Sequence, residues 1–223
     1  MMNESNMINL YTQYHEYTDI LYPILSILYL LLSFAFVIYF QKITSMKTHP
    51  TNQSLPDVLH KDEYTWLAKY HYINNYSIYI ECFWIIYCNI KPFTLMNIIS
   101  TIYMIRPFFF ASTILPRPSI TPKKREYSNL PIWKIVLKYI LLIDRNPGYD
   151  NDLIFSGHTS FLTVFVLHLW TFGTYSIYIN IGVTIINFIS SIIIVMNRNH
   201  YTICNLVAYL ISYIIYDKLK YLV

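Results

Sequence analysis

The sequence predicts an all-α, polytopic membrane protein with about six transmembrane helices in one bundle. Of its 223 residues, 55% are hydrophobic and 13% are charged, whereas about 25% of the residues in a soluble domain are charged. Several apolar runs are long enough to cross a hydrocarbon core about 30 Å thick, which takes roughly 20 helical residues. Because lipid offers no hydrogen bonds to the backbone, runs of this kind form helices.

The apolar runs define the expected spans. The first run carries one charge, Asp19 at its edge, and residues 159–196 contain no Lys, Arg, Asp or Glu. The six expected spans are Ile20–Phe40, Asn75–Ile90, Pro92–Leu115, Gly157–Thr171, Tyr175–Met196 and Tyr201–Tyr216. Residues 20–216 would thus form one transmembrane domain between short tails, 1–19 and 217–223, the second of them basic. No basic segment precedes the first span, so we expect that span to remain as an anchor rather than to be cleaved as a signal peptide.

Two long connections, residues 41–74 and 116–155, hold most of the charged and turn-forming residues. Within the second, residues 130–143 mix Ile, Val and Leu with Trp133, Lys134 and Lys138. This mixture is typical of a helix that lies in the membrane interface. A seventh span with poor spacing is the alternative.

The basic residues predict an orientation. Twelve Lys and Arg residues fall in the first, third and fifth connections, and three fall in the remaining connections and the tails. Because Lys and Arg accumulate on the cytoplasmic side, this bias would place the long connections in the cytoplasm.

The segment Ser156-Gly157-His158-Thr159 stands at the predicted start of a span. Free backbone N–H groups and the positive end of the helix dipole favour a phosphate there. Ser156 can cap the helix, and Gly157 permits close approach of a ligand to the backbone. Taken alone, the segment is more typical of an ordinary helix cap than of a phosphate site.

A second histidine, His200, also stands at the start of a span, just before Tyr201 and Thr202. His158 ends the third connection and His200 ends the fifth, so both lie on one face of the membrane. Imidazole titrates near neutral pH and can act as nucleophile, acid or base. Two converging histidines could therefore divide phosphoryl chemistry, one attacking phosphorus and the other protonating the departing oxygen.

Arg106 lies deep in the third expected span. A charge at this depth costs at least about 2.5 kcal/mol unless it finds a partner or reaches the interface. Its forked donors suit a phosphate, so Arg106 is a candidate phosphate clamp. The alternative is a packing role in which it pairs with a carboxylate or a carbonyl.

Four ordered segments resemble the sphingomyelin synthase family, a branch of the lipid phosphate phosphatase superfamily. They resemble its Pro-Leu-Pro-Asp segment, its Arg followed by Thr-x-Leu-Pro, its Asp-x-x-x-Ser-Gly-His-Thr segment and its His-Tyr-Thr segment. In this chain they are Leu55-Pro56-Asp57, Arg106 with residues 112–116, Asp152 to Thr159, and His200 to Ile203.

The resemblance implies transfer of phosphocholine or phosphoethanolamine from a glycerophospholipid donor to a ceramide-like acceptor, without a cofactor or a metal. His200 would become a phosphohistidine, and His158 would act as acid and then as base. The substrate-binding residues would be Arg106, Asp152, Ser156, Gly157 and Tyr201. The implied partners are membrane lipids rather than nucleic acid, and the implied location is the Golgi, the endoplasmic reticulum or the plasma membrane, in sphingolipid metabolism.

The chain departs from the family at one catalytic position. The family has an Asp four residues after the second histidine, whereas this chain has Cys204 followed by Asn205. A neutral thiol cannot stabilise an imidazolium as a carboxylate does, and losing such an acid typically costs orders of magnitude in rate. We therefore expect impaired activity. The family's active site also faces the lumen or the cell exterior, against the orientation that the basic residues predict.

Two other functions remain open. Water could resolve the same phosphohistidine, which would make the protein a lipid phosphatase or a hydrolase of phospholipase C type. The superfamily's Lys-x6-Arg-Pro segment would favour hydrolysis, yet the residue seven before Arg106 is Ile99. A non-catalytic lipid-binding membrane protein of the same fold is the other alternative.

Overall fold

The structure of the chain is a computed structural model. It describes residues 4–44, 55–57, 59–60, 72–113, 115–116, 130–140, 154–198 and 200–222, with the backbone alone for 4–19, 72–75 and 138–140.

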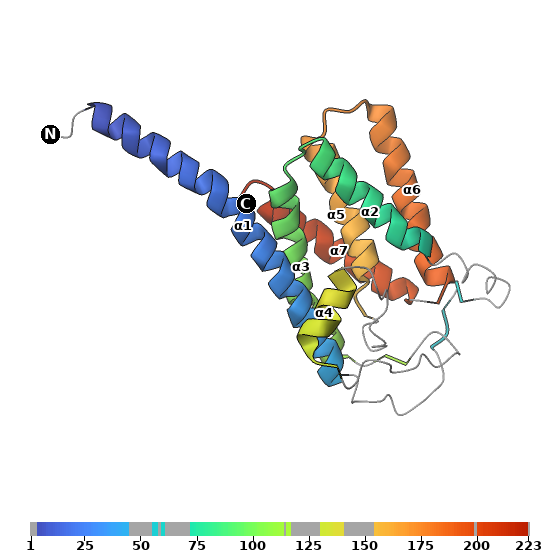
Figure 1. Cartoon of the computed structure of the whole chain (residues 1–223). Helices are drawn as coiled ribbons and strands as arrows, with labels where there is room; N and C mark the ends of the chain where they lie inside the picture. Colours follow the sequence, from blue (N-terminus) through green and yellow to red (C-terminus); the bar gives the residue numbers. More distant parts are fainter. Residues whose placement is uncertain are drawn as a thin grey trace.

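The regular structure of these described residues is entirely helical, which confirms the predicted all-α class (Figure 1). The three longest connections between these helices lie before α2 and on either side of α4, within the two long connections that the sequence predicts. The helices are α1 (Glu4–Thr44), α2 (Tyr72–Tyr87), α3 (Pro92–Ser112), α4 (Ile132–Ile140), α5 (Gly157–Phe172), α6 (Ile177–Met196) and α7 (Thr202–Leu219).

Length and composition make four of the described helical segments suitable for crossing a membrane. These are Ile20–Thr44 of α1, Pro92–Ser112, Ile177–Met196 and Thr202–Leu219. The helices α2 and α5 have 16 residues each, somewhat short of the roughly 20 that a straight span requires. Both pack into the same bundle, so the protein is a polytopic helical membrane protein.

The first helix is longer than the apolar run predicts. It begins at Glu4 and continues through Pro23 to Thr44, so the described part of the segment expected as an N-terminal tail is helical. Its first turns project away from the other helices (Figure 1). The helix α3, in contrast, ends at Ser112, before the expected end at Leu115. The backbone of Thr113 is extended, with φ −135° and ψ 106°, so the helix does not continue there.

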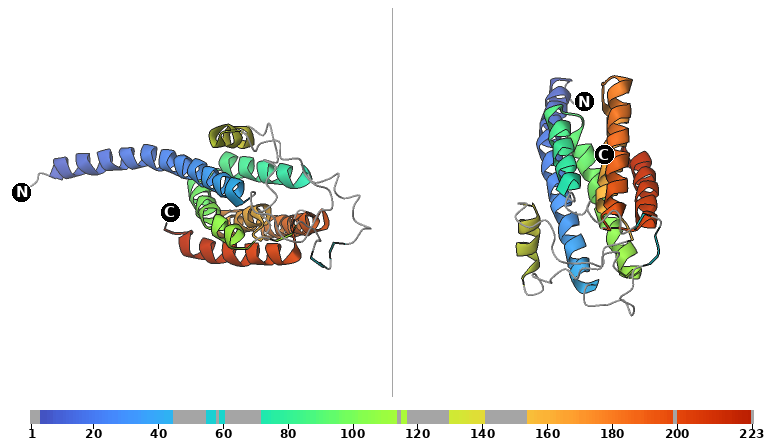
Figure 2. Two further views of the ribbon diagram at one scale, coloured as in Figure 1. Left: turned by 90° about the horizontal axis from the view of Figure 1, so that it is seen from below. Right: turned by 90° about the vertical axis from the view of Figure 1, so that its right-hand side faces the viewer.

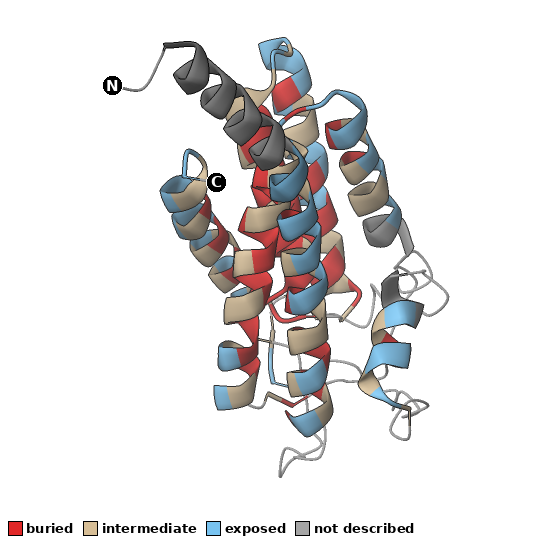
Figure 3. Ribbon diagram, turned by 60° about the vertical axis from the view of Figure 1, so that its left-hand side comes forward, coloured by how far each residue is buried: buried red, intermediate tan, exposed pale blue. Residues whose placement is uncertain are grey.

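Buried residues face the interior of the bundle (Figure 3), and many of them form one apolar cluster. Ile98, Phe110 and Phe165 are fully buried, so their side chains pack against protein, and such packing holds membrane helices together. The outer faces of the helices are also apolar but exposed, as Leu32 and Phe188 illustrate. Exposed apolar surface on this scale is unusual for a soluble monomer, and it suits contact with lipid.

The helix α4 lies against the end of α1. Ile135 is buried against Ile38, and Lys42 Nζ of α1 donates to the carbonyl oxygen of Leu130 at 3.1 Å, while Trp133 of α4 is exposed. The helix thus has one covered face and one open face, as expected of an interfacial helix. The described part of the helix has 9 residues, against the roughly 20 that a straight span requires.

The end of α3 and the starts of α5 and α7 lie close together. In the right-hand view of Figure 2, α1, α3 and α6 run roughly along a common direction. The last turns of α3 lie beside the start of α5, since Arg106 contacts Phe155. The start of α5 in turn lies beside the start of α7, since Thr159 contacts Asn205. The segments that carry the candidate site residues therefore meet at one end of the bundle.

Candidate active site

The start of α5 is fixed by a serine cap and a buried aromatic ring. Ser156 has extended backbone, with φ −63° and ψ 113°, and its Oγ accepts the Thr159 N–H at 3.3 Å. Phe155 is fully buried in the core. A cap of this kind satisfies one of the N–H groups that a helix start leaves open. The N–H groups of the first turn retain the positive end of the dipole, which suits an anion.

Arg106 reaches the start of α5 from α3. Its side chain is buried, and its Nε donates to the carbonyl oxygen of Phe155 at 2.8 Å. The guanidinium lies 5.5 Å from the centre of the Tyr103 ring. It also lies so close to Gly157 that a β-carbon there would be 2.6 Å from Arg106 Nη1. Two features of a phosphate site, a fixed guanidinium and a helix start, are therefore combined here.

A hydrogen-bonded chain ties α5, α6 and α7 together. Thr159 Oγ1 lies 3.0 Å from Ser156 Oγ and donates to Asn205 Oδ1 at 2.9 Å. Asn205 Nδ2 donates to the carbonyl oxygen of Ser191 on α6 at 2.7 Å. All four side chains are buried. Because water does not reach them, these bonds provide the partners that buried polar groups need. The first turns of α5 and α7 are thereby held side by side.

Both candidate histidines are adjacent to this link. His158 precedes Thr159 in the first turn of α5, is half-buried, and lies within electrostatic range of Arg106. His200 is buried in the bend two residues before α7 begins. The fold thus brings the segments of His158, Arg106, Ser156 and Gly157 together with that of His200. A direct approach of the two imidazole rings stays a prediction.

The turn before α7 has an unusual backbone and an unusual partner. Arg198 has a positive φ of 54°, a conformation that is uncommon for residues other than glycine, and it reverses the chain after α6. Its Nη2 donates to the carbonyl oxygen of His60 at 3.1 Å. The segment 55–60 from the first long connection, far away in sequence, therefore lies against this turn.

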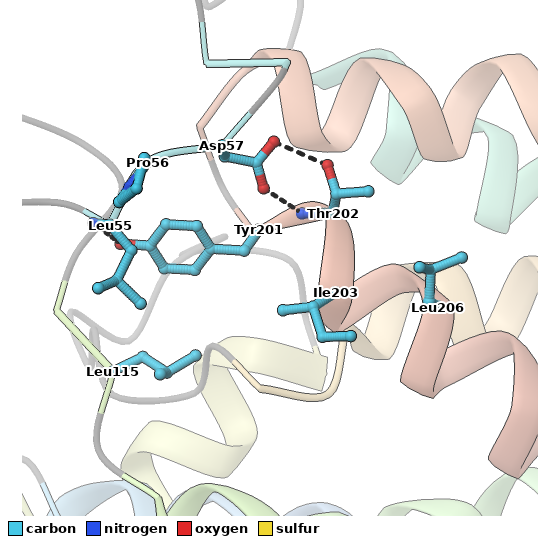
Figure 4. Close-up of a pocket in the computed structure, with 8 residues that line it drawn as sticks. All are labelled: Leu55, Pro56, Asp57, Leu115, Tyr201, Thr202, Ile203 and Leu206. Carbon is cyan, nitrogen blue, oxygen red and sulfur yellow. Dashed lines mark hydrogen bonds between the residues drawn. The ribbon is translucent and has the colours of Figure 1, made fainter.

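A pocket of about 360 Å³ opens beside the start of α7 (Figure 4). Tyr201 forms part of its wall, and its hydroxyl donates to the Pro116 carbonyl oxygen at 2.8 Å and accepts the Leu55 N–H at 3.0 Å. The walls are mostly apolar, but neither histidine nor Arg106 lines them. The lining residues are Leu55, Pro56, Asp57, Leu115, Tyr201, Thr202, Ile203 and Leu206.

Asp57 and His60 lie beside the start of α7, and neither was expected from the sequence to act at the site. Asp57 Oδ2 accepts the Thr202 N–H at 2.7 Å, and Asp57 Oδ1 accepts the Thr202 hydroxyl at 2.7 Å. Burial would raise the pKa of Asp57, but hydrogen bonds from Leu59 and Thr202, together with His60, hold that pKa below its ordinary value. The resemblance pointed to Asp57 but gave it no role, and no local pattern marked His60.

Two other expectations concern residues close to the histidines. Cys204, which stands where the resembled family has an Asp, is fully buried in the first turn of α7. Asp152, expected to bind substrate, lies outside the described residues. Among the residues that the structure does describe, no three His, Cys, Asp or Glu side chains gather as a metal site would require.

A separate polar cluster lies between α2 and α6, away from the helix starts. Glu81 and Asn187 are both buried, and the Asn187 amide lies beside the Glu81 carboxyl. Within the described chain, Glu81 Oε2 and both polar atoms of the Asn187 amide have no hydrogen-bond partner. An intramembrane acidic residue is costly and usually functional, but this cluster does not join the candidate active site.

Comparison with known families bears on the C-terminal third of the chain. Residues 151–222 match the family described as PAP2 superfamily C-terminal. This region contains α5, α6 and α7 with both candidate histidines. The match supports the lipid phosphate phosphatase superfamily, whose members include the phosphatase and phosphotransferase types of lipid-acting membrane protein. No curated protein matches the chain.

Proposed function

We propose, from this superfamily match, that the protein is a lipid phosphotransferase of the sphingomyelin synthase type. It would move phosphocholine or phosphoethanolamine from a glycerophospholipid to ceramide, in the Golgi, the endoplasmic reticulum or the plasma membrane. The observation that supports this most is the joining of the first turns of α5 and α7 through Thr159 and Asn205. That link brings the chain segments of His158 and His200 to one end of the bundle, where Arg106 meets Gly157.

In the first half of the proposed reaction, the phosphate of the donor lipid binds at Arg106 and the start of α5. A neutral nitrogen of His200 attacks phosphorus, and the bond between phosphorus and the diacylglycerol oxygen breaks. His158 delivers a proton to that oxygen, so diacylglycerol leaves as a neutral alcohol. Arg106 and the helix N–H groups stabilise the negative charge on the phosphoryl oxygens during the transfer.

In the second half, the primary hydroxyl of ceramide binds where diacylglycerol departed. His158, now neutral, takes the hydroxyl proton while the oxygen attacks phosphorus. The bond between phosphorus and the His200 nitrogen breaks, which frees the imidazole and yields the phosphosphingolipid. The same histidine therefore acts as acid and then as base, so the proton balance closes over one cycle.

The experiment is a product analysis in membranes that contain the full chain. Membranes receive fluorescent ceramide, and the lipids are separated by thin-layer chromatography. We expect a fluorescent phosphosphingolipid with the wild type, and none with His158→Ala or His200→Ala. His168→Ala is a matched control because His168 lies on α5 but contacts the carbonyl oxygen of Ile90 at 2.8 Å, so it should retain the product if folded. Equal product from His200→Ala would contradict the proposal.

Hydrolysis is the second candidate function. It is favoured by the family match, which reaches the lipid phosphate phosphatase superfamily and no further. In hydrolysis, water rather than ceramide attacks the phosphohistidine and releases the phosphorylated head group. Release of a labelled, water-soluble head group without any ceramide present, abolished by His200→Ala, would identify a hydrolase.

A further inference from the structure

The segment 55–60 and the start of α7 are held together by contacts across about 140 residues of chain. His60 Nε2 lies 3.0 Å from the carbonyl oxygen of His200. The His60 ring also packs on the Tyr201 ring, with 5.2 Å between their centres. Arg198 adds a bond to the His60 carbonyl oxygen. One short segment therefore contacts Arg198, His200 and Tyr201.

The chemistry of the His60 contact fixes its direction. A carbonyl oxygen accepts only, so Nε2 of His60 carries the hydrogen and donates it to His200. The other ring nitrogen, Nδ1, is buried and has no hydrogen-bond partner among the described residues. His60 therefore holds the backbone of His200 in place rather than its imidazole.

Asp57 supplies the second anchor. The Thr202 N–H belongs to the first residue of α7, and the first N–H groups of a helix have no partner within the helix. The preceding residue, Tyr201, provides no side-chain cap. The carboxylate of Asp57 takes that role from another part of the chain, through both Thr202 N–H and Thr202 Oγ1 (Figure 4). A negative charge at a helix start is also favoured by the dipole.

We infer that Asp57 and His60 form a clasp that positions His200 for attack on phosphorus. The inference rests on the proposed function for the role of His200, but the contacts of the clasp do not depend on it. A nucleophile must be held within about 0.5 Å of its productive position, and His200 lies in a bend outside any helix. Asp57 and His60 are positioning residues, because they act through the backbone on either side of the nucleophile.

Kinetics of the full chain in mixed micelles test the clasp. Asp57→Ala and His60→Leu should each lower kcat by about 10²-fold, since a displacement near 1 Å costs about that much, with KM changed by less than about two-fold. Asp57→Asn and His60→Gln keep one acceptor and one donor respectively, so each should recover most of the rate. Asp217→Ala is the matched control and should keep the wild-type kcat, since the carboxylate of Asp217 accepts a bond from Lys220 at the other end of α7.

Hydrogen exchange separates failure of the clasp from failure of the proposed reaction. The Thr202 amide should exchange slowly in the wild type, and faster in Asp57→Ala while the later α7 amides stay protected. This readout needs no activity, so an inactive wild type with a protected Thr202 amide would refute the proposed function alone. Rapid exchange at Thr202 in the wild type, or full kcat in both Asp57→Ala and His60→Leu, would overturn the clasp. Should Asp57→Ala not fold, His60→Leu decides.

Discussion

The guanidinium of Arg106 occupies the space that a side chain at position 157 would need. A β-carbon on Gly157 would lie 2.6 Å from Arg106 Nη1 and 3.1 Å from the hydroxyl oxygen of Tyr103. Arg106 cannot simply swing away, because its Nε is bonded to the Phe155 carbonyl oxygen in the buried interior. Because Gly157 has no side chain, the guanidinium of Arg106 on α3 can lie against the start of α5.

Replacing this glycine should displace the arginine. We predict that Gly157→Ala lowers the rate of phosphosphingolipid formation by about 10²-fold, because a shift of the clamp near 1 Å suffices for that loss. The rate is measured in membranes with fluorescent ceramide. Gly182→Ala is the control, since a β-carbon at Gly182 meets nothing within 4 Å. Equal rates for Gly157→Ala and the wild type would show that Arg106 takes no part in the reaction.

The link between α5 and α7 should be visible in stability. Thr159→Val removes the donor to Asn205 Oδ1 and leaves a buried acceptor unpaired, which typically costs about 1–3 kcal/mol. The free energy of unfolding in detergent, from denaturant titration, measures the loss. Thr163→Val is the control, because the hydroxyl of Thr163 donates to the carbonyl oxygen of Thr159 within the same helix. A loss no greater than that of the control would mean that Thr159 does not join the helices.

The buried thiol at position 204 should limit the rate. Four residues after His200, a carboxylate could stabilise the imidazolium form, which the neutral Cys204 cannot. We predict that Cys204→Asp raises kcat at least about ten-fold, whereas Cys204→Ala leaves it unchanged. Both variants are assayed after size-exclusion chromatography confirms folding. An unchanged or lower kcat in folded Cys204→Asp would show that this position does not act on the nucleophile.

Asp57 should make stability depend on pH in the acid range. Its pKa in the folded protein is below the ordinary value, so its stabilising effect is present above that ordinary value and disappears as pH falls through the lowered one. Wild type should therefore be more stable than Asp57→Asn near about pH 6 and converge with it near about pH 2. Thermal unfolding at several pH values gives the comparison. A constant difference would exclude the charge of Asp57 as the cause.

The helices could be predicted from sequence because their signal is local. A run of apolar residues that crosses lipid has no alternative to a helix, and five of the six expected spans begin within three residues of an observed helix. The first does not, since the polar residues before Ile20 continue α1 without an apolar signal. The ends were less well predicted, as with Pro92–Leu115 against α3, because capping depends on neighbouring segments.

The site was predictable only where its residues form a compact motif. Ser156, Gly157 and His158 stand together and at a helix start, and each has a recognisable role there. The contacts of Asp57 and His60 with α7 join residues separated by about 140 positions, and nothing in the local sequence encodes such a pairing. The packing of Arg106 on Gly157 likewise appears only once α3 and α5 are placed side by side.

The covalent intermediate gives the most direct test of the central claim, that His200 attacks phosphorus with His158 as its partner. The purified full chain is incubated with a phospholipid that carries a radiolabelled phosphate, quenched without acid and digested for mass spectrometry. We expect an acid-labile label on the peptide that contains His200, and no such label in His200→Ala. A label at another residue, or lipid product formed at the wild-type rate by His200→Ala, would contradict it.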